Sequence, residues 1–525
     1  MPPRHIAVLG GGLTGLSSAF HLSRRFPFAR ITLLEKQNRP GGWVRSEQVQ
    51  LGTNEDTTTS LTVEAGPRTL RPNSKAVLEL VNLLDLKSEL LTTPRSSPAA
   101  RNRFLYLPDV QSGLTDIPTS MFGFLRSPIR GLLLSAIFTE PLRSPNRVPT
   151  QYVNVDGSKR IYQDESLDNF LSRRFGPEVA RVLGSALCHG VYAADSRRLS
   201  VRAAFPVLYN LEEKGNGRVV FGILKDILGV GAGKKSRHAE GGQMYDLGDV
   251  EQLMQGVSVY SFCGGVQTLT DALAKALAAT SNVELCYGQD VKEIEMYEDE
   301  NSSLAIHTTV QTLKPTHVVS SIPLPLLNAI LPPSGSYACP LPHLTANPSS
   351  SVTVLSLVFA VPSNTVHPAG FGYLIPRPRG GYPPPTDVPT RPGILGTVFD
   401  SCALPFKSNS ESEYTKLTVM LGGPYPSPLP ETDYELITRV LAHLAESLLQ
   451  PLPDPIATRV WRHVDCIPTP GVGHLERMKE LKNVLEEESG RGAWRGRLEV
   501  VGAGVGGVSV GDCVEAGRRV GARWQ

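Results

Sequence analysis

Hydrophobic residues near the start of the chain alternate between strand-like runs and helical periods. The apolar run at 6–9 predicts a buried parallel strand, and the run at 31–34 predicts a second one. Between them, the spacing of apolar positions predicts a helix that begins near Leu13. Over 170–187, apolar residues recur every three or four positions, as expected for packed helices. The opening pattern therefore predicts an α/β unit followed by a helical segment.

A second sheet is predicted further along the chain. Short β-rich runs lie between proline-rich loops, at 352–361, 394–400 and 415–421. The amphipathic helix predicted at 433–449 would cover this sheet, because its apolar residues fall on one face.

Two other segments indicate a return to the first unit. Residues 266–277 place four apolar side chains on one helical face, and 498–524 again predict a strand, a glycine turn and a helix. The segment 229–256 is rich in glycine, charged and aperiodic, which predicts a mobile loop.

The first strand is joined to the first helix by Gly10, Gly12 and Gly15, at the spacing of dinucleotide-binding turns. Gly10 would permit the tight turn, Gly12 the approach of a pyrophosphate, and Gly15 close packing of helix and strand. Glu35 ends the second strand, where its carboxylate can accept both ribose hydroxyls and disfavours the 2′-phosphate of NADP. A glycine motif alone could be a structural turn, but the whole strand–helix–strand–acid pattern predicts a dinucleotide site.

Composition narrows the class of protein. The 525 residues are 41% hydrophobic and 19% charged with a net charge of +2, as in ordinary globular proteins, and no basic block supports nucleic-acid binding. Seven cysteines without CxxC spacing and eleven histidines without paired ligand spacing predict neither a disulfide scaffold nor a metal site. No apolar run is long enough for a spanning helix, and because the first strand begins at Ile6, any organelle address is expected to be internal.

Five stretches resemble the protoporphyrinogen IX oxidase family of FAD enzymes, in its eukaryotic, fungal-like form. They are GGGLTGLSSAFHLSRR with GGWVRS at 10–25 and 41–46, EAGPRTLRP at 64–72, NRFLYLPD at 102–109, HGVYAADSRRLSVRAAFP at 189–206 and VGAGVGGVSVGDCVEAGR at 501–518. The middle three are more specific than the nucleotide motif, and together the five run through almost the whole chain.

The resemblance implies a set of FAD contacts. These are Gly10, Gly11, Gly12, Leu13, Thr14, Gly15, Glu35, Trp43, Gly66, Pro67, Arg68, Thr69, Val291, Ala503, Val508, Ser509 and Val510. For Arg68 the alternative is a surface salt bridge close to Glu64, and for 503–510 it is a glycine-rich packing turn.

A substrate site is implied in the same way. Its residues are Arg103, Phe371, Gly372, Leu374, Val398 and Met420. A guanidinium matches a carboxylate bidentately, so Arg103 would orient the propionates of an apolar macrocycle. Without the resemblance, Arg103 would be a solvated residue and the others core packing.

The implied fold is α/β, with a discontinuous glutathione-reductase-like FAD-binding Rossmann domain, a second mixed-sheet substrate domain and a helical membrane-associated insertion. The segments are 1–105, 257–325 and 456–525 for the FAD domain, 106–228 for the insertion with the substrate channel, 229–256 for the mobile loop and 326–455 for the substrate sheet.

The implied activity is the oxygen-dependent six-electron oxidation of protoporphyrinogen IX to protoporphyrin IX in haem biosynthesis. FAD carries the chemistry, hydrogen peroxide is released, and no side-chain base is predicted. Two alternatives stay open: an FAD oxidase of coproporphyrinogen III or an amine, and a non-catalytic lipid carrier of the same fold, like the Rab GDP-dissociation inhibitors.

The resemblance also implies a location and partners. The segment 122–143, apolar and flanked by Arg126, Arg130 and Arg143, is expected to anchor the protein peripherally, although a buried helix would have the same pattern. The expected place is the intermembrane-space side of the mitochondrial inner membrane. Ferrochelatase and a second copy of the chain are the expected protein partners, beside the porphyrinogen and dioxygen.

Overall fold

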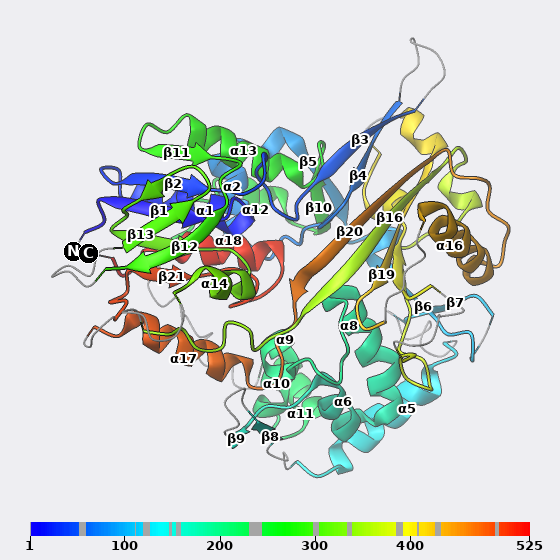
Figure 1. Cartoon of the computed structure of the whole chain (residues 1–525). Helices are drawn as coiled ribbons and strands as arrows, with labels where there is room; N and C mark the ends of the chain where they lie inside the picture. The colour runs from blue at the N-terminus through cyan, green and yellow to red at the C-terminus, as the bar shows by residue number, and fades with distance from the viewer. Residues whose placement is uncertain are drawn as a thin grey trace.

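The computed structural model describes residues 2–51, 59–110, 112–118, 127–145, 150–153, 159–229, 244–297, 304–332, 339–384, 392–406, 409–425, 432–488 and 493–524. The chain forms a lobe around a parallel sheet, a lobe around a larger, mostly antiparallel sheet, and a helical lobe beneath the second (Figure 1). Both termini lie at the parallel-sheet lobe (Figure 1).

The parallel sheet has five strands contributed by the first, middle and last parts of the chain. Their order is β11 (Val283–Cys286), β2 (Arg30–Leu34), β1 (His5–Leu9), β15 (His317–Ser320) and β21 (Leu498–Val500), and every neighbouring pair is parallel. The central strand β1 is apolar from Ile6 to Leu9 because these residues are fully buried between layers on both faces. The strand order reverses between β1 and β15, which opens a crevice at the carboxyl ends of the strands.

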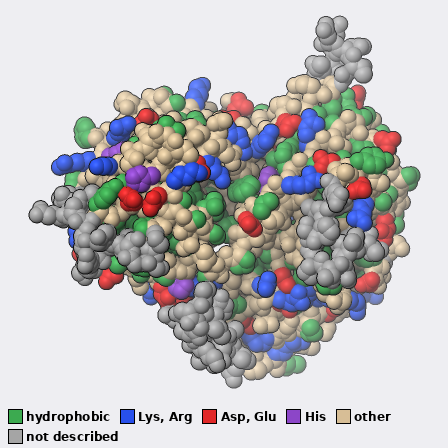
Figure 2. Space-filling view, in the orientation of Figure 1, with side chains coloured by type: hydrophobic (Ala, Val, Ile, Leu, Met, Phe, Trp, Pro, Cys, Tyr) green, Lys and Arg blue, Asp and Glu red, His purple; other side chains and the backbone are tan. Residues whose placement is uncertain are grey.

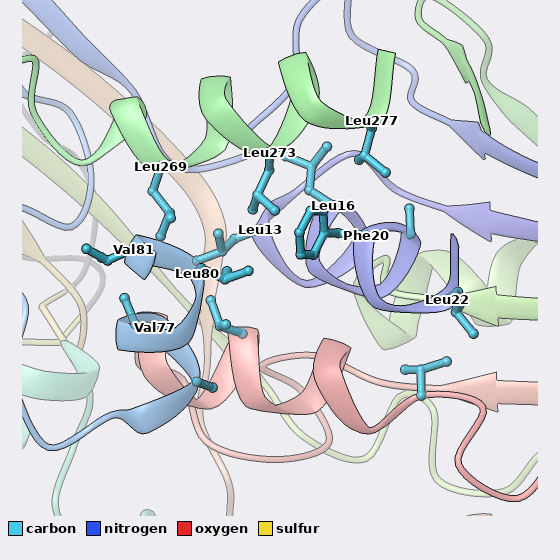
Figure 3. Close-up of a cluster of buried hydrophobic side chains, with 14 of the residues drawn as sticks. Leu13, Leu16, Phe20, Leu22, Val77, Leu80, Val81, Leu269, Leu273 and Leu277 are labelled. Atoms are coloured by element: carbon cyan, nitrogen blue, oxygen red, sulfur yellow. The ribbon is translucent and has the colours of Figure 1, made fainter. Parts of the chain in front are cut away.

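One face of this sheet packs against helices. They are α1 (Leu13–Arg25), α2 (Lys75–Leu83), α13 (Gln267–Ala278) and α18 (Val510–Arg519). Figure 3 shows Leu269, Leu273 and Leu277 on the side of α13 that faces α1 and α2, and all three are fully buried. The predicted apolar stripe at 266–277 is therefore confirmed as a packed helix face.

The other face is covered by a small sheet and two helices. The small sheet consists of β12 (Val291–Met296), β13 (Leu304–Thr308) and β14 (Thr312–Leu313), and the helices are α14 (Leu324–Ile330) and α17 (His474–Glu486). Leu327, Leu481 and the fully buried Trp494 fill the space beneath them.

The larger sheet has seven strands. In order they are β20 (Ala457–Pro468), β16 (Ser349–Phe359), β19 (Thr415–Gly422), β18 (Ile394–Val398), β17 (Gly372–Leu374), β6 (Phe104–Tyr106) and β7 (Leu114–Asp116). All neighbours are antiparallel except β17 and β6. The predicted covering helix is confirmed as α16 (Asp433–Leu448), whose Leu436, Val440 and Leu444 are fully buried against one face.

The helical lobe contains a buried ionic network. Its elements are α5 (Arg130–Thr139), η2 (Glu140–Leu142), α6 (Leu167–Phe175), α7 (Pro177–Val179), the π-helical η3 (Ala180–Gly184), α8 (Ser185–Tyr192), α9 (Val201–Ala204), α10 (Pro206–Lys214), α11 (Val219–Ile227) and the hairpin β8 (Thr150–Val153) and β9 (Lys159–Tyr162). Arg174 donates from Nε to Glu140 Oε1 at 2.8 Å, and Val219 N donates to the same oxygen at 2.8 Å. Glu212 completes the network, and all three charged side chains are fully buried.

The remaining elements are short. They are β3 (Ser46–Leu51) with β4 (Thr59–Glu64), β5 (Leu90–Pro94) with β10 (Val257–Phe262), α3 (Pro98–Arg101), α12 (Val250–Leu253), α15 (Asp400–Ala403), and the turns η1 (Lys87–Glu89), η4 (Ser363–Thr365) and η5 (Asn409–Glu413).

Two predicted boundaries and part of one predicted loop differ from the structure. Strand β20 belongs to the seven-stranded sheet and not to the parallel-sheet unit predicted for 456–525, because it pairs along its length with β16. Strand β6 joins the same sheet although it begins before residue 106. The part of the predicted mobile loop at 244–256 is packed, since Val250 of α12 is fully buried and Tyr245 donates to Glu515 at 2.9 Å. Residues 230–243 of that loop lie outside the described residues.

Candidate functional site

The glycine turn after β1 leaves space at the start of α1. Gly10, at φ +96°, donates its N–H to Leu34 O at 2.8 Å, and Gly12 is the N-cap of α1. A Cβ added to Gly15 would lie 1.9 Å from Gly10 O, so this glycine lets strand and helix touch. A Cβ on Gly12 would meet no atom within 4 Å, so the corner is open where helical N–H groups point outward.

Glu35 is held rigidly beside this corner. Its side chain is buried, and it accepts hydrogen bonds from Gly11 N to Oε2 at 2.7 Å and from Gln37 N to Oε1 at 2.8 Å. Val291 begins β12 close by, two residues after Gln289, whose N–H donates to Glu35 O at 2.9 Å. The structure thus places a fixed carboxylate at the end of β2.

The segment after Glu35 folds back onto the glycine turn. Gly41 donates to Gly11 O at 2.8 Å, which brings Trp43 next to the second turn at 66–69. A Cβ on Gly66 would lie 2.3 Å from Trp43 O. The Trp43 ring is 46% exposed and meets His463 edge-on, with 5.3 Å between the ring centroids.

Arg68 points into the protein rather than to the surface. Only 9% of it is exposed, and its Nη1 is buried without a hydrogen-bond partner among the described residues. It lines a cavity of about 50 Å³ between the lobes together with Glu64, Ser261, Asp400 and Thr418. Burial raises the pKa of Glu64 to about 7, against hydrogen bonds from Ser46 and Val266 that lower it.

The C-terminal glycine segment brings a second helix to the same edge of the sheet. Ser509 caps α18 in a capping box with Asp512, and α18 packs against α1, with Ser17 Oγ donating to Val514 O at 3.0 Å. A Cβ on Gly506 would meet nothing within 4 Å. A Cβ on Gly502 would lie 3.8 Å from Thr14 Oγ1, so the glycine segment passes the first turn of α1. Ala503 and Val508 follow in this segment and Val510 begins α18, whose N-terminus carries partial positive charge.

The predicted substrate residues gather on the larger sheet. Gly372 pairs with Val398, and Leu374 and Met420 both pair with Gly396, so these four predicted residues share a face. Because the alternate residues Tyr373 and Val419 belong to the core beneath α16, the shared face is the opposite one, toward α8. Figure 2 shows the surface hollowed between the lobes, with hydrophobic side chains in the hollow.

Arg103 stands at the start of β6, on the strand next to β17. Its guanidinium lies 5.8 Å from the centroid of the Phe371 ring, and Phe371 N donates to Asn102 O at 3.0 Å. Burial lowers the pKa of Arg103, and the charge of Arg71 lowers it further. The structure thus brings Arg103 and Phe371 together at the edge of the apolar face.

Sequence reasoning missed two groups. Ser321 donates from Oγ to Leu9 O at 2.8 Å and so closes the glycine turn, and its place directly after the strand 317–320 was the only available signal. His189 of α8 contacts Ile375 O through Nδ1 at 2.7 Å and Tyr382 Oη through Nε2 at 2.8 Å. Burial lowers the pKa of His189 to about 4, so the ring is neutral, and no local pattern signals this distant cluster.

The described residues contain no group of three or more His, Cys, Asp or Glu side chains placed to hold a metal ion. Among them, no helix combines the length and apolar character needed to cross a membrane. The seven cysteines are all free thiols.

Known proteins resemble the chain along its whole length. Residues 13–523 match the family of flavin containing amine oxidoreductases. Protoporphyrinogen oxidase of Homo sapiens is 32% identical, covering 98% of this chain and 97% of that protein. The enzyme of that name from Schizosaccharomyces pombe is 31% identical, with 98% and 96% covered.

Solved structures share the fold. A protein from Exiguobacterium sp. 255-15 superposes with a TM-score of 0.70 at 20% identity, covering 98% of this chain and 97% of its own. Reduced UDP-galactopyranose mutase has a TM-score of 0.61 at 15% identity, with 99% and 95% covered. These matches establish an α/β fold with mixed sheets and a flavin cofactor. The chain is a member of the protoporphyrinogen oxidase family of flavin-containing amine oxidoreductases.

Proposed function

We propose that this protein oxidises protoporphyrinogen IX to protoporphyrin IX with FAD and dioxygen. Six hydrogens leave the substrate in three two-electron steps, and each step reduces one dioxygen to hydrogen peroxide. The observation that carries the proposal is the pair of open glycine corners, at Gly12 and Gly506, near two helix N-termini and the fixed carboxylate of Glu35. In a chain of this family, such an arrangement fits an anionic dinucleotide.

The residues present fit FAD in particular. The parallel sheet, with its strand order reversing beside β1, supports a glutathione-reductase-like Rossmann domain built from three separate segments. Glu35 would accept the ribose hydroxyls, and the N–H groups beyond Gly12 would hold the pyrophosphate. Trp43, the turn at 66–69, Val291, Ala503 and the start of α18 would hold the remainder. When bound, the flavin supplies the hydride acceptor of the reaction.

The protein contributes orientation, dryness and charge. Among the residues that the structure describes, the buried Nη1 of Arg68 has no partner, so it can donate a hydrogen bond to a bound cofactor. The N-terminus of α18 stabilises negative charge next to it. The apolar face around Leu374, Val398 and Met420 excludes water from the macrocycle, and Arg103 pairs with a propionate.

A spectrum and one assay test the proposal. The purified protein should be yellow with a flavin absorption band, and acid release should give FAD rather than FMN. Anaerobically prepared protoporphyrinogen IX, mixed with the enzyme and oxygen, should form fluorescent protoporphyrin with three equivalents of peroxide. A colourless protein would favour the lipid-carrier alternative, and faster turnover of coproporphyrinogen III or an amine would favour another oxidase.

We also propose that the helical lobe attaches the protein to a membrane surface. Phe138 of α5 is 71% exposed and Leu142 of η2 is 86% exposed, and α11 beside them exposes 74% of Ile227. Arg143 donates to the carbonyls of Ser172 and Arg173 at the end of α6, so it serves the lobe itself. Arg126 and the rest of 119–126 lie outside the described residues. The exposed apolar side chains favour an interfacial anchor over a buried helix.

Flotation with liposomes tests the anchor. The Phe138→Asp and Ile227→Asp double variant should stay in solution while retaining its flavin, whereas Val310→Asp, an exposed apolar residue on another lobe, should float as the parent does. Unchanged flotation of the double variant would contradict the anchor. We propose the intermembrane-space side of the mitochondrial inner membrane as the location, which protease protection of mitochondria would check. We also propose self-association there, to be checked by gel filtration, and product transfer to ferrochelatase, to be checked by co-purification.

A further inference from the structure

Three polar side chains of η3 and α8 hold the main chain where it leaves strand β17. Arg181, Ser185 and His189 follow one another at intervals of four residues, so they share one face of the helix. Arg181 Nη1 donates to Arg377 O at 3.0 Å, and Arg377 N donates to Ser185 Oγ at 2.8 Å. His189 Nδ1 contacts Ile375 O at 2.7 Å. The helix thus binds the backbone just beyond β17 at three successive points.

The hydrogen-bond partners of His189 fix its tautomer and its orientation. A carbonyl oxygen only accepts hydrogen bonds, so the Nδ1 atom that contacts Ile375 O carries the proton. The neutral ring then accepts at Nε2, and Tyr382 Oη donates to it at 2.8 Å. The Tyr382 ring meets Tyr425 edge-on, with 5.1 Å between the centroids, and the Arg197 guanidinium lies 5.4 Å from its centroid. His189 is fully buried and held at both ring nitrogens.

The carbonyl that His189 binds belongs to the residue next to Leu374, which is part of the apolar face. Ile375 N donates to Leu395 O at 2.9 Å, so Ile375 is the last residue held to β18 before the chain leaves the sheet. On the helix, Gly190 follows His189, and a Cβ added to Gly190 would lie 3.0 Å from Leu374 Cδ2. Two successive helix residues therefore contact two successive residues at the end of β17, one by packing and one by a hydrogen bond.

We propose that His189 is a positioning residue of the porphyrinogen site. By donating to Ile375 O it sets the distance between α8 and the end of β17, and so places Leu374 against the macrocycle. This inference rests on the proposed function. A partly buried carbonyl that loses its donor costs free energy, so without His189 the chain turns this carbonyl toward water and Leu374 moves with it.

Two amide substitutions separate the roles of the two ring nitrogens. Counted in bonds from Cβ, the amide nitrogen of asparagine stands where Nδ1 stands, and the end of the glutamine amide stands where Nε2 stands. His189→Asn should therefore keep the donor to Ile375 O, whereas His189→Gln should lose it and keep only a partner for Tyr382. The KM for protoporphyrinogen IX should rise roughly tenfold in His189→Gln, the effect of one buried hydrogen bond, and less than about threefold in His189→Asn.

The separation of KM from kcat distinguishes positioning from a loss of stability. A destabilised enzyme has fewer active molecules, so its apparent kcat falls while its KM stays at the parent value, whereas a displaced wall weakens binding and raises KM. The melting temperature and the flavin content of each variant are measured beside the kinetics. Quenching of protoporphyrin IX fluorescence gives a dissociation constant without turnover, which should rise in His189→Gln by the same factor as KM.

The matched control is His307→Gln. Both ring nitrogens of His307 are also bonded, to Thr312 Oγ1 and Glu295 Oε2 at 3.0 Å each, but this histidine lies on β13 of the small sheet. It should keep the parent KM and dissociation constant. A second variant of the same contact face, Ser185→Ala, removes the acceptor of Arg377 N and should raise KM about threefold, so the proposal stays testable if His189→Gln does not fold.

Three results would overturn the positioning role. They are a parental KM in both His189→Gln and Ser185→Ala, a His189→Asn variant as impaired as His189→Gln, and an equal effect of the control His307→Gln. If the parent oxidises protoporphyrinogen IX and any of these results is found, only this inference fails. A parent that neither oxidises the porphyrinogen nor binds protoporphyrin overturns the proposed function, and this inference with it.

Discussion

Adding one methyl group at Gly12 should remove the flavin without unfolding the protein. Gly12 has φ −71° and ψ 178°, which alanine adopts freely, and the added Cβ would meet no protein atom within 4 Å. The loss of a good N-cap costs about 0.5 kcal/mol, and the smaller entropy of the unfolded chain offsets much of it. The stability of the apoprotein should therefore hardly change.

The same methyl group would occupy the space where a pyrophosphate meets the helix. Losing one or two charge-assisted hydrogen bonds, at roughly 1.5–3 kcal/mol each, weakens FAD binding by about 3 kcal/mol, or roughly a hundredfold. Gly15→Ala should behave differently, because its Cβ would lie 1.9 Å from Gly10 O and must displace the turn. That variant should lose both flavin and stability.

The assay separates the two effects. The stability of each apoprotein variant is measured by thermal unfolding. In a separate sample, the folded apoprotein is titrated with FAD and binding is followed by flavin fluorescence. Gly131→Ala, at another glycine whose Cβ meets nothing but which lies in α5 of the helical lobe, is the control and should bind FAD as the parent does. The reasoning is refuted if Gly12→Ala binds FAD normally, or if its apoprotein is destabilised as much as that of Gly15→Ala.

Further predictions concern buried charge. Arg174→Met should destabilise the helical lobe by about 3–5 kcal/mol, because it leaves Glu140 buried and unpaired, and adding Glu140→Gln should recover part of this in limited proteolysis. Burial raises the pKa of Glu64 from 4.5 to about 7, so the stability that comes from its protonated form is complete below pH 4.5 and lost as pH rises to 7. Between pH 4.5 and 7, the free energy of unfolding of Glu64→Gln should therefore rise by about 3 kcal/mol relative to that of the parent, as measured by denaturant titrations at each pH. A difference between the two proteins that does not change with pH would contradict the assignment.

Much of the strand, glycine turn and helix of the predicted dinucleotide site could be predicted because the sequence signals are local. The buried strand β1, the glycines and the helix α1 follow one another within a few residues, so the hydrophobic period and the turn chemistry agree. The stripe of α13 and the covering face of α16 were predictable for the same reason.

The errors arose where long-range pairing decides the structure. Strand β20 is partly exposed along its length, which suits an edge strand of either sheet, and its register with β16 is not visible in its own residues. In 244–256, only Val250 and Met254 are deeply buried, and contacts to α2 and α18 supply the order that composition did not suggest.

The position of β21 and α18 has a consequence for biosynthesis. Helix α1 is complete after the first 25 residues, yet its packing partner Gly517 and the second helix N-terminus at Ser509 come from the other end of the chain. At 5–20 residues per second, a ribosome needs roughly 25 to 100 s to travel between these points. The nascent protein therefore carries an incomplete nucleotide cleft with an uncovered apolar helix during most of its synthesis. The cleft can therefore be completed, and the cofactor fully enclosed, only after residues 509–517 have been made.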